Sequence, residues 1–422
     1  MSTLYKDKNI TKMYYGSKPV YSFSVEDGGG TGGDTTTYSY KTPTADVEGL
    51  KALGWDDKSI GYFRDNNLCY DWQKDNYIVT DGNKELYGVV TKDNISTYKS
   101  DPNFVYCPMI DTSNVASMNY MFYGCSLLQS IPLLNTSNVT NMSNMFIYCS
   151  TLQSIPPIDT SKVTDMGNMF AFCQSLQSIP LLDTANVIDM SGIFDSCQSL
   201  QSIPLLNTSK VTNMSNMFYT CRTLQSIPQI DTSNVTNMRA IFYSCSTLQS
   251  IPMLDTSKVI DMNYMFYGCS LLQSIPQFDT SNVTDMGNIF YSCQSLQSIP
   301  PIDTSKVTNM TNMFNDCRKI QSIPLLDCGI VTNMSNFFGW SNINTLTDLG
   351  GFKDLKISVT SSFLEKAPNL TVESLMNVIN NVYDLTANGL SGQSLKFGST
   401  NLNKLTAEQV AIATAKGWTL TA

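Results

Sequence analysis

Residues 255–276 read D-T-S-K-V-I-D-M-N-Y-M-F-Y-G-C-S-L-L-Q-S-I-P, and the chain repeats this motif at a constant step. Valine, methionine and phenylalanine keep a 24-residue step through ten copies, starting at Val115, Met118 and Phe122, without an insertion. Nine cysteines keep the same step: Cys125, Cys149, Cys173, Cys197, Cys221, Cys245, Cys269, Cys293 and Cys317. A fixed period of this size is typical of a solenoid, in which each copy forms one coil.

The apolar residues within one copy lie mostly three residues apart, which shows that a coil must change direction. On a single α-helix each three-residue step lags by about 60°, so the apolar stripe would drift around the helix. We therefore expect one or two helical turns over 262–269, with Met265 and Phe266 inward, and a short strand over 272–275. Pro276 would end that strand or lie on its outer face, and Asp279 would start the turn that follows.

Stacked coils of this kind predict an α/β architecture, a right-handed leucine-rich-repeat-like solenoid with short parallel strands and short helical turns. Like residues would form columns about 4.8 Å apart. One coil cannot close its own core, because about eight apolar side chains at about 2 kcal/mol each barely offset the ordering of the backbone. Neighbouring coils and a cap at each end must supply the remaining stability.

The motif resembles a known family. The string M-F-x-x-C-x-x-L-x-x-I-P after D-T-S-x-V-x-x-M is similar to the BspA-like class of bacterial leucine-rich repeats and to repeats of mycoplasma surface lipoproteins, and the resemblance covers residues 108 to about 340. It implies a leucine-rich-repeat-like solenoid whose members act mostly as surface adhesins that bind proteins or glycans. The resemblance assigns no catalytic residue to this chain, since the family motif contains none.

Composition excludes several classes of function. The formal charge of -9 and the pI near 4.6 argue against nucleic acid as a partner, because phosphate binding needs a basic face. The chain has no histidine, the commonest general base and zinc ligand. No stretch approaches twenty consecutive apolar residues, so we expect no membrane insertion.

The first residues predict an anchor and a tether. Residues 1–27 are interpreted as a small β anchor with strands at 10–15 and 20–25, and residues 28–37 as a flexible Gly/Thr-rich linker. The string I-T-K-M-Y-Y-G-S-K-P-V-Y is similar to short N-terminal segments by which some phage tail and fibre proteins attach to the particle. The segment lacks the apolar core of a secretory signal, so we expect a protein made in the cytosol.

Caps are predicted on both sides of the repeats. Residues 38–107 form the N-terminal cap, with helices over 45–53 and 56–65 and a strand at 77–80. Residues 108–347 hold the ten repeats, and Gly350-Gly351 breaks their rhythm. Residues 348–422 hold atypical coils and a second cap: a helix over 371–382, a strand at 394–397, a helix that starts with a capping box at Thr406, and a last strand at 418–420.

Two columns could carry chemistry, and each has a simpler explanation. The cysteines lie close enough for disulfides between coils, but nine parallel side chains and the absence of an export signal favour buried reduced thiols. The sequence contains no C-x-x-C pair, the spacing that would indicate a zinc site. A second column could bind calcium or could cap turns without any ion: Asp111, Asn135, Asp159, Asp183, Asn207, Asp231, Asp255, Asp279, Asp303 and Asp327. Because the copies are near-identical, no single pair of acids has the distinct pKa values that an enzyme needs, and we expect no catalytic site and no required cofactor.

The position after the core phenylalanine should project outward and is the candidate receptor-binding site. Five of its residues are tyrosines, an amphipathic contact residue enriched at interfaces: Tyr123, Tyr219, Tyr243, Tyr267 and Tyr291. Edge packing between coils is the alternative explanation for the same pattern. The Gln-Ser pair of each copy is invariant, so specificity should lie where copies differ.

These features favour a non-enzymatic virion protein, a phage tail or head fibre component. Residues 1–27 would bind a virion structural protein, and the solenoid would bind a host cell-surface protein or glycan. One alternative is a BspA-like adhesin on a bacterial cell surface, and another is an intracellular protein–protein interaction scaffold. The sequence leaves the receptor and homo-oligomer formation open.

Overall fold

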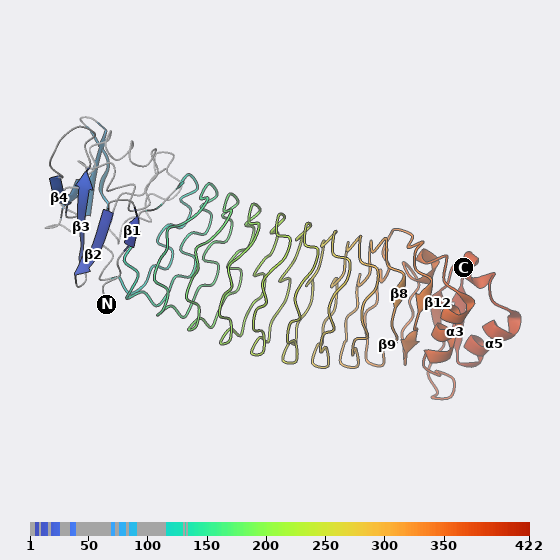
Figure 1. The fold of residues 1–422 in the computed structure, drawn as a ribbon. Coiled ribbons are helices and arrows are strands. Elements are labelled where there is room, and N and C mark those ends of the chain that lie inside the picture. The colour runs from blue at the N-terminus through green and yellow to red at the C-terminus, as the bar shows by residue number, and fades with distance from the viewer. Residues whose placement is uncertain are drawn as a thin grey trace. The chain divides into compact units, whose positions relative to one another are not determined.

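The structure is a computed structural model that describes residues 115–129, 131 and 134–422 in full, and the backbone of seven strands before them. The chain divides into two compact units, Met1–Asn186 and Val187–Ala422, and each is described by itself. Figure 1 shows most of the second unit as a row of coils that lie side by side, with helices confined to its C-terminal end. The stacked coils that the period predicts are therefore present.

The N-terminal strands form two antiparallel sheets in the order β1-β2-β3-β4 and β5-β6-β7. Their bounds are β1 (Tyr5–Asp7), β2 (Ile10–Tyr15), β3 (Lys18–Val25), β4 (Asp34–Tyr38), β5 (Cys69–Asp71), β6 (Asn76–Asp81) and β7 (Lys84–Val90). The predicted strands at 10–15, 20–25 and 77–80 are confirmed. β4 covers the end of the segment assigned to a flexible linker, since three successive threonines favour extended backbone.

Other predictions for the N-terminal part lie outside the described residues. These are the helices over 45–53 and 56–65 and the first residues of the repeats, 108–114. The boundaries of the anchor, linker and cap stay predictions.

The predicted helical turns are wrong, because the segment after each core methionine is a series of tight turns. In the coil that starts at Val259, Met265 N donates to Met262 O at 3.1 Å, and Cys269 N donates to Phe266 O at 3.1 Å. Tyr264 has a φ of 60° and Gly268 a φ of 72°. Left-handed residues every fourth position exclude an α-helix. Within residues 115–129, 131 and 134–321 of the repeats, no helix forms.

The main hydrogen-bond ladder between coils runs through these turns. Tyr264 N donates to Gly287 O at 3.1 Å, Phe266 N to Ile289 O at 3.0 Å, and Gly268 N to Tyr291 O at 2.7 Å. The N–H groups of the alternate residues bond within the coil, so successive N–H groups alternate between the coil and its neighbour. Backbone polar groups near a buried core need such partners, and the ladder supplies them.

The predicted strand over 272–275 is also wrong. Its proline lacks an N–H donor, and a single bond from Gln297 N to Gln273 O, 3.1 Å long, joins these residues to the next coil. Parallel strand pairs occur later: β8 (Ser322–Ile323) with β10 (Asp348–Leu349), and β9 (Leu326–Asp327) with β11 (Phe352–Lys353). Gly350 and Gly351 lie between β10 and β11, so they continue the stack instead of breaking it.

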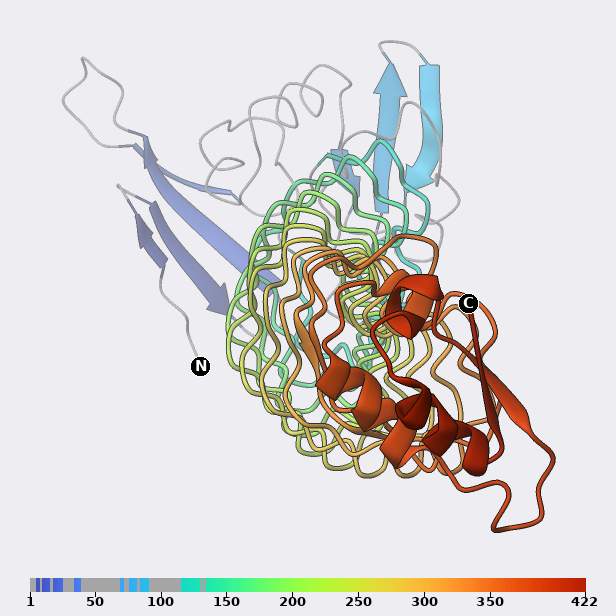
Figure 2. The same ribbon diagram turned by 90° about the vertical axis from the view of Figure 1, so that its right-hand side faces the viewer.

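Identical residues form the core in columns. Valine, methionine, phenylalanine, cysteine and leucine of each complete coil are buried, and Met265 and Phe266 point inward as predicted. Within the second unit, successive phenylalanine rings stack from Phe194 to Phe314 with centroids 5.5 to 6.0 Å apart. Figure 2 shows the successive coils overlying one another, which is why like residues fall into columns.

The C-terminal cap matches the sequence prediction closely. α3 (Val372–Asn381) begins after Thr371, whose side chain accepts from Ser374 N, and α5 (Ala407–Ala415) begins with the predicted capping box of Thr406 and Gln409. The remaining elements are η3 (Leu364–Lys366), α4 (Ser399–Leu402), and the parallel pair β12 (Gln393–Lys396) and β13 (Trp418–Thr421). None of the described helices combines the length and the apolar composition needed to cross a membrane.

Candidate binding face

The cysteine column is structural. The ten cysteines of the described part are free and buried. Cys269 Sγ donates to Phe242 O of the preceding coil at 3.1 Å, and the same bond recurs along the column. Burial raises the pKa of the Cys269 thiol well above its usual value. A buried neutral thiol is a poor nucleophile. The predicted burial of the cysteines is confirmed.

The acidic column caps turns. Asp255 Oδ1 accepts from Ser257 N at 3.0 Å, and Asp279 Oδ1 accepts from Ser281 N at 3.0 Å. The hydroxyl and the N–H of Ser281 hold the pKa of Asp279 below its ordinary value. Within 115–129, 131 and 134–422, no three acidic or thiol side chains cluster so as to hold a metal ion. The predicted turn-capping role is confirmed.

Four of the five predicted site tyrosines form one continuous stack in the second unit. The ring centroids of Tyr219 and Tyr243 lie 4.3 Å apart, those of Tyr243 and Tyr267 4.4 Å, and those of Tyr267 and Tyr291 4.5 Å. The ring planes diverge by 8° or less. All four side chains are half-buried. The middle rings, Tyr243 and Tyr267, have a stacked tyrosine on both faces, and the end rings, Tyr219 and Tyr291, have one on a single face.

Tyr123 belongs to a separate cluster in the first unit. Its ring meets Tyr120 at 5.5 Å and Tyr148 at 5.8 Å, both edge-on, and Tyr148 stacks on Phe172 at 4.7 Å. The structure therefore brings together Tyr219, Tyr243, Tyr267 and Tyr291 and does not join Tyr123 to them.

The tyrosine rings stack more closely than the core phenylalanine rings of the same coils. The centroid distance between successive rings is 4.3 to 4.5 Å at the tyrosines and 5.5 to 6.0 Å at the phenylalanines. The faces of neighbouring tyrosine rings are therefore in close contact.

An aromatic and charged group flanks the stack. The Tyr264 ring lies 6.1 Å from Tyr243 and 5.9 Å from Tyr267, and the Arg239 guanidinium lies over the Tyr264 ring at 5.2 Å. Arg239 Nη1 is also 3.9 Å from Asp261 Oδ2. We define the tyrosine face as the four stacked tyrosines with Tyr264 and Arg239. Sequence reasoning missed Arg239, although it interrupts a position otherwise held by small or polar residues.

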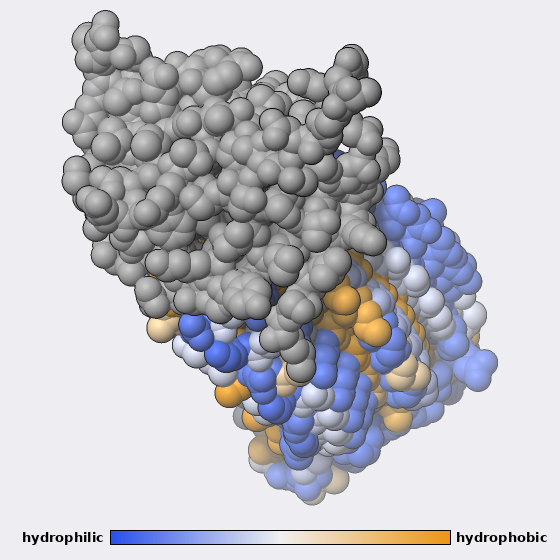
Figure 3. All heavy atoms as spheres, turned by 60° about the vertical axis from the view of Figure 1, so that its left-hand side comes forward, coloured by the Kyte–Doolittle hydropathy of each residue, from blue (hydrophilic) through white to orange (hydrophobic). Residues whose placement is uncertain are grey.

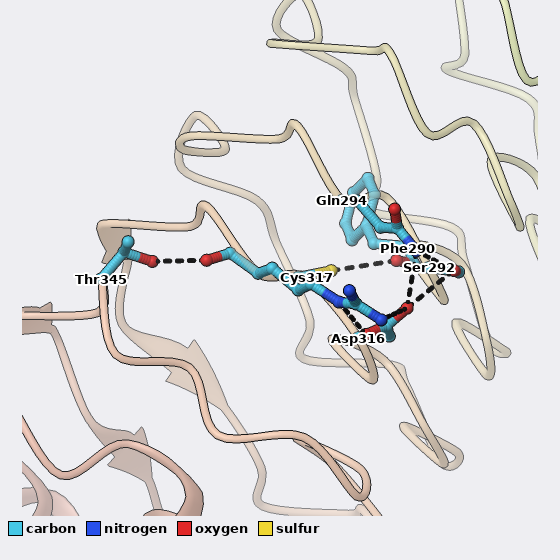
Figure 4. Close-up of polar contacts among 7 residues, drawn as sticks. Phe290, Ser292, Gln294, Asp316, Cys317 and Thr345 are labelled. Carbon is cyan, nitrogen blue, oxygen red and sulfur yellow. Dashed lines mark hydrogen bonds and ion pairs between the residues drawn. The ribbon is translucent and has the colours of Figure 1, made fainter.

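A polar cluster surrounds the carboxylate of Asp316, and one of its members, Ser292, follows Tyr291 in the chain (Figure 4). Asp316 Oδ2 accepts from Gln294 Nε2 at 2.9 Å and from Ser292 Oγ at 3.0 Å, and Asp316 Oδ1 accepts from Arg318 Nε at 2.6 Å. Although burial alone would raise its pKa, these hydrogen bonds hold the pKa of Asp316 below its ordinary value. The carboxylate is thus charged and fully paired.

A second surface feature, absent from the sequence prediction, follows each Ile-Pro pair. Leu205 and Met253 are 64% and 57% exposed, and they line a shallow groove of ≈ 970 Å³ together with Gln229, Asp231 and Asp255. Figure 3 shows apolar residues gathered in bands between hydrophilic ones on the surface of the coils. The groove is open and largely apolar, without a convergent set of reactive groups.

The tyrosine stack should titrate late. Burial first, and then the neighbouring phenols, raise the pKa of Tyr267 to about 12, against about 10 for a free phenol. The stabilising contribution of the neutral phenol is therefore complete below about pH 10 and is lost as the pH rises toward 12. An alkaline titration followed by absorbance at 295 nm detects the ionisation of phenols. In Tyr267→Phe we expect the part of the absorbance change near pH 12 to decrease by the equivalent of one phenol. A decrease near pH 10 instead would contradict a desolvated stack.

Comparison with known proteins identifies similar repeats. The family profile described as "Mycoplasma protein of unknown function, DUF285" matches residues 105–203, 149–253, 212–322, 246–352 and 294–388. A search of curated proteins found no match.

The chain is also similar to solved structures, of which three are given with their sequence identity and TM-score. A leucine-rich-repeat protein of T. pallidum is 18% identical and has a TM-score of 0.24. The match covers 51% of this chain and 76% of the T. pallidum chain. The plant peptide hormone receptor RGFR1, solved with RGF2, is 12% identical with a TM-score of 0.25, covering 64% and 56%. The TLR13–ssRNA13 complex is 13% identical with a TM-score of 0.22, covering 68% and 52%.

Proposed function

The chain belongs to the family described as Mycoplasma protein of unknown function, DUF285, and we propose that this member is a non-enzymatic binding protein whose tyrosine face contacts a protein partner. The observation that carries the proposal is the unbroken stack of four half-buried tyrosines on one face of the coils. A stack held in one orientation loses little conformational entropy when a partner binds, which favours affinity.

The stacking geometry favours a protein over a glycan. A sugar ring recognised by an aromatic residue lies flat on the ring face, and here the faces of Tyr243 and Tyr267 are covered by other tyrosines within 4.5 Å. The exposed atoms are ring edges and hydroxyl groups, which suit the mixed apolar and polar surface of a protein. Tyrosine and arginine are also the residues enriched at interface hot spots, and Arg239 supplies the arginine.

The setting we propose is a phage virion, with the protein as a fibre component that binds a bacterial surface protein. The small antiparallel sheet β1-β2-β3-β4, which includes the segment similar to phage attachment segments, supports this proposal. A bacterial surface adhesin and an intracellular scaffold use the same face and are the alternatives. Electron micrographs of particles labelled with an antibody to this chain would distinguish them, since an adhesin labels cells that carry no prophage.

Removing two central tyrosines tests the binding face. We expect Tyr243→Ser combined with Tyr267→Ser to lower binding of the labelled full chain to intact cells of the source strain at least tenfold, because the two rings form the middle of the contact. Binding is measured by flow cytometry over a concentration series. The double variant Tyr243→Phe and Tyr267→Phe keeps the stacked rings and should retain most of the binding.

Two further measurements make the result decisive. Far-UV circular dichroism and the thermal midpoint must show that the serine variant stays folded, since the core phenylalanines are untouched. Protease treatment of the cells should abolish binding, and periodate treatment should spare it, if the receptor is a protein. Unchanged binding by the folded serine variant would reject the tyrosine face.

A further inference from the structure

One residue of the tyrosine column is a carboxylate. Asp195 holds the position equivalent to Tyr219 in the adjacent coil of the second unit. The backbones of these two coils are in register there, since Phe194 N donates to Met217 O at 3.0 Å and Ser196 N donates to Tyr219 O at 2.6 Å. The Asp195 side chain therefore lies beside the ring of Tyr219, as one tyrosine lies beside the next farther along the column.

Asp195 lacks a cationic partner among the described residues. Its Oδ1 accepts a hydrogen bond from Ser196 Oγ at 2.8 Å, and no lysine or arginine of the described part forms an ion pair with it. Burial raises the pKa of the Asp195 carboxyl, in keeping with the absence of a neighbouring positive charge. Partial burial of an unpaired carboxylate is unfavourable, so a cation at this point would be stabilising.

The aromatic neighbour of Asp195 has one ring face that no other ring of the described residues covers. Tyr219 is the last ring of the stack, with one face against Tyr243 at a centroid distance of 4.3 Å. Its other face is turned toward the coil of Asp195, whose side chain is too short to cover a whole phenol ring. An open aromatic face beside a carboxylate attracts a guanidinium or an ammonium group through both charge and the ring quadrupole.

The same face already contains this arrangement with all three members present. Arg239 lies over the Tyr264 ring at 5.2 Å and 3.9 Å from Asp261, so a cation contacts both an aromatic ring and a carboxylate. Asp316, at the other end of the stack, is likewise paired with Arg318. Both of these carboxylates receive an arginine from this chain, and Asp195 does not.

We propose that Asp195 and the open face of Tyr219 form a subsite for an arginine or lysine side chain of the protein partner. The inference rests on the proposed function, because it names the chemistry that the partner must present at one end of the tyrosine face. It predicts that the contact region of the partner carries a cationic side chain next to the groups that pack on the tyrosine edges.

A pair of small probes of nearly equal shape tests the subsite on the full chain. Nα-acetyl-L-arginine methylamide carries the cation, and Nα-acetyl-L-citrulline methylamide replaces it by a neutral urea. We expect the arginine probe to bind about five to ten times more tightly, with shifts of the Asp195 carboxyl and Tyr219 ring signals in NMR titrations. In Asp195→Asn, both probes should bind with the same weak affinity.

The control variant is Asp279→Asn, which removes one negative charge from an exposed turn and leaves the tyrosine face intact. It should keep the preference for arginine. Asn315 occupies the equivalent position of a later coil, so asparagine is compatible with the backbone at position 195, and circular dichroism checks folding. Tyr219→Leu provides a second folded variant, which should also lose the preference.

Three results would overturn the subsite: equal binding of the two probes by the native chain, an arginine preference that survives in Asp195→Asn, or a preference lost equally in Asp279→Asn. These probes report on Asp195 alone. If they fail while the tyrosine variants still lose binding to cells, the subsite is wrong and the binding face stands. If the tyrosine variants keep full binding, the proposed function fails whatever the probes show.

Discussion

Phe242→Ala should lower the free energy of unfolding by about 3 to 5 kcal/mol, because it opens a cavity in the middle of the phenylalanine column. The Phe242 side chain is fully buried, and its ring lies between Phe218 at 5.7 Å and Phe266 at 5.8 Å. Both neighbours belong to other coils that are fixed by the ladder through the turns, so the site has little freedom to collapse. Urea denaturation followed by circular dichroism measures the loss.

Two control variants distinguish the cost of the cavity in Phe242→Ala from other effects on the free energy of unfolding. Phe242→Leu keeps most of the volume and should cost less than half as much as the alanine variant. Tyr243→Phe changes the next residue along the chain, which is half-buried on the tyrosine face, and should alter stability by well under 1 kcal/mol. A loss below about 1 kcal/mol for Phe242→Ala would show that the coils repack freely and would contradict a close-packed column.

The architecture could be predicted from the sequence because the period alone specifies stacked coils. The path of the backbone within a coil could not, since spacing three residues apart fits both a helical turn and a series of tight turns. The deciding signal lies at the position two before each core phenylalanine, such as Asn144, Asn216 and Asn288. Asparagine holds six of the ten copies of this position and glycine one, and both residues favour the left-handed region that the structure shows.

The candidate site was predictable in composition but not in geometry. Five tyrosines at one position of the repeat indicated an exposed aromatic column, and the structure stacks four of them. A sequence does not reveal that their faces cover one another, because stacking depends on the exact displacement between coils. We propose that ring edges, with Arg239 and Asp195 beside them, are what a partner meets.

Gly350→Ala is the second large effect we expect, a loss of about 3 kcal/mol through overpacking of the last coils. A Cβ atom at this position would lie 2.3 Å from Leu325 N and 2.7 Å from Pro324 C. Both are backbone atoms of the preceding coil, held by the hydrogen bond from Gly350 N to Ile323 O at 2.9 Å, so no side-chain rotation relieves the clash. The glycine therefore marks a point where the backbones of two coils approach closely.

Gly389→Ala is the matched control, because Gly389 has a φ of 66° and a Cβ atom added there would meet no other atom within 4 Å. It should cost only about 1 to 2 kcal/mol for placing alanine in the left-handed region. Hydrogen exchange should show the effect of Gly350→Ala in β8, β10 and α3, while the coils around Phe242 keep their protection, since each coil contacts only its neighbours. If the two glycine variants lose equal free energy of unfolding, the coils at Gly350 can move apart at little cost. The close contact at Gly350 would then not stabilise the C-terminal end of the stack.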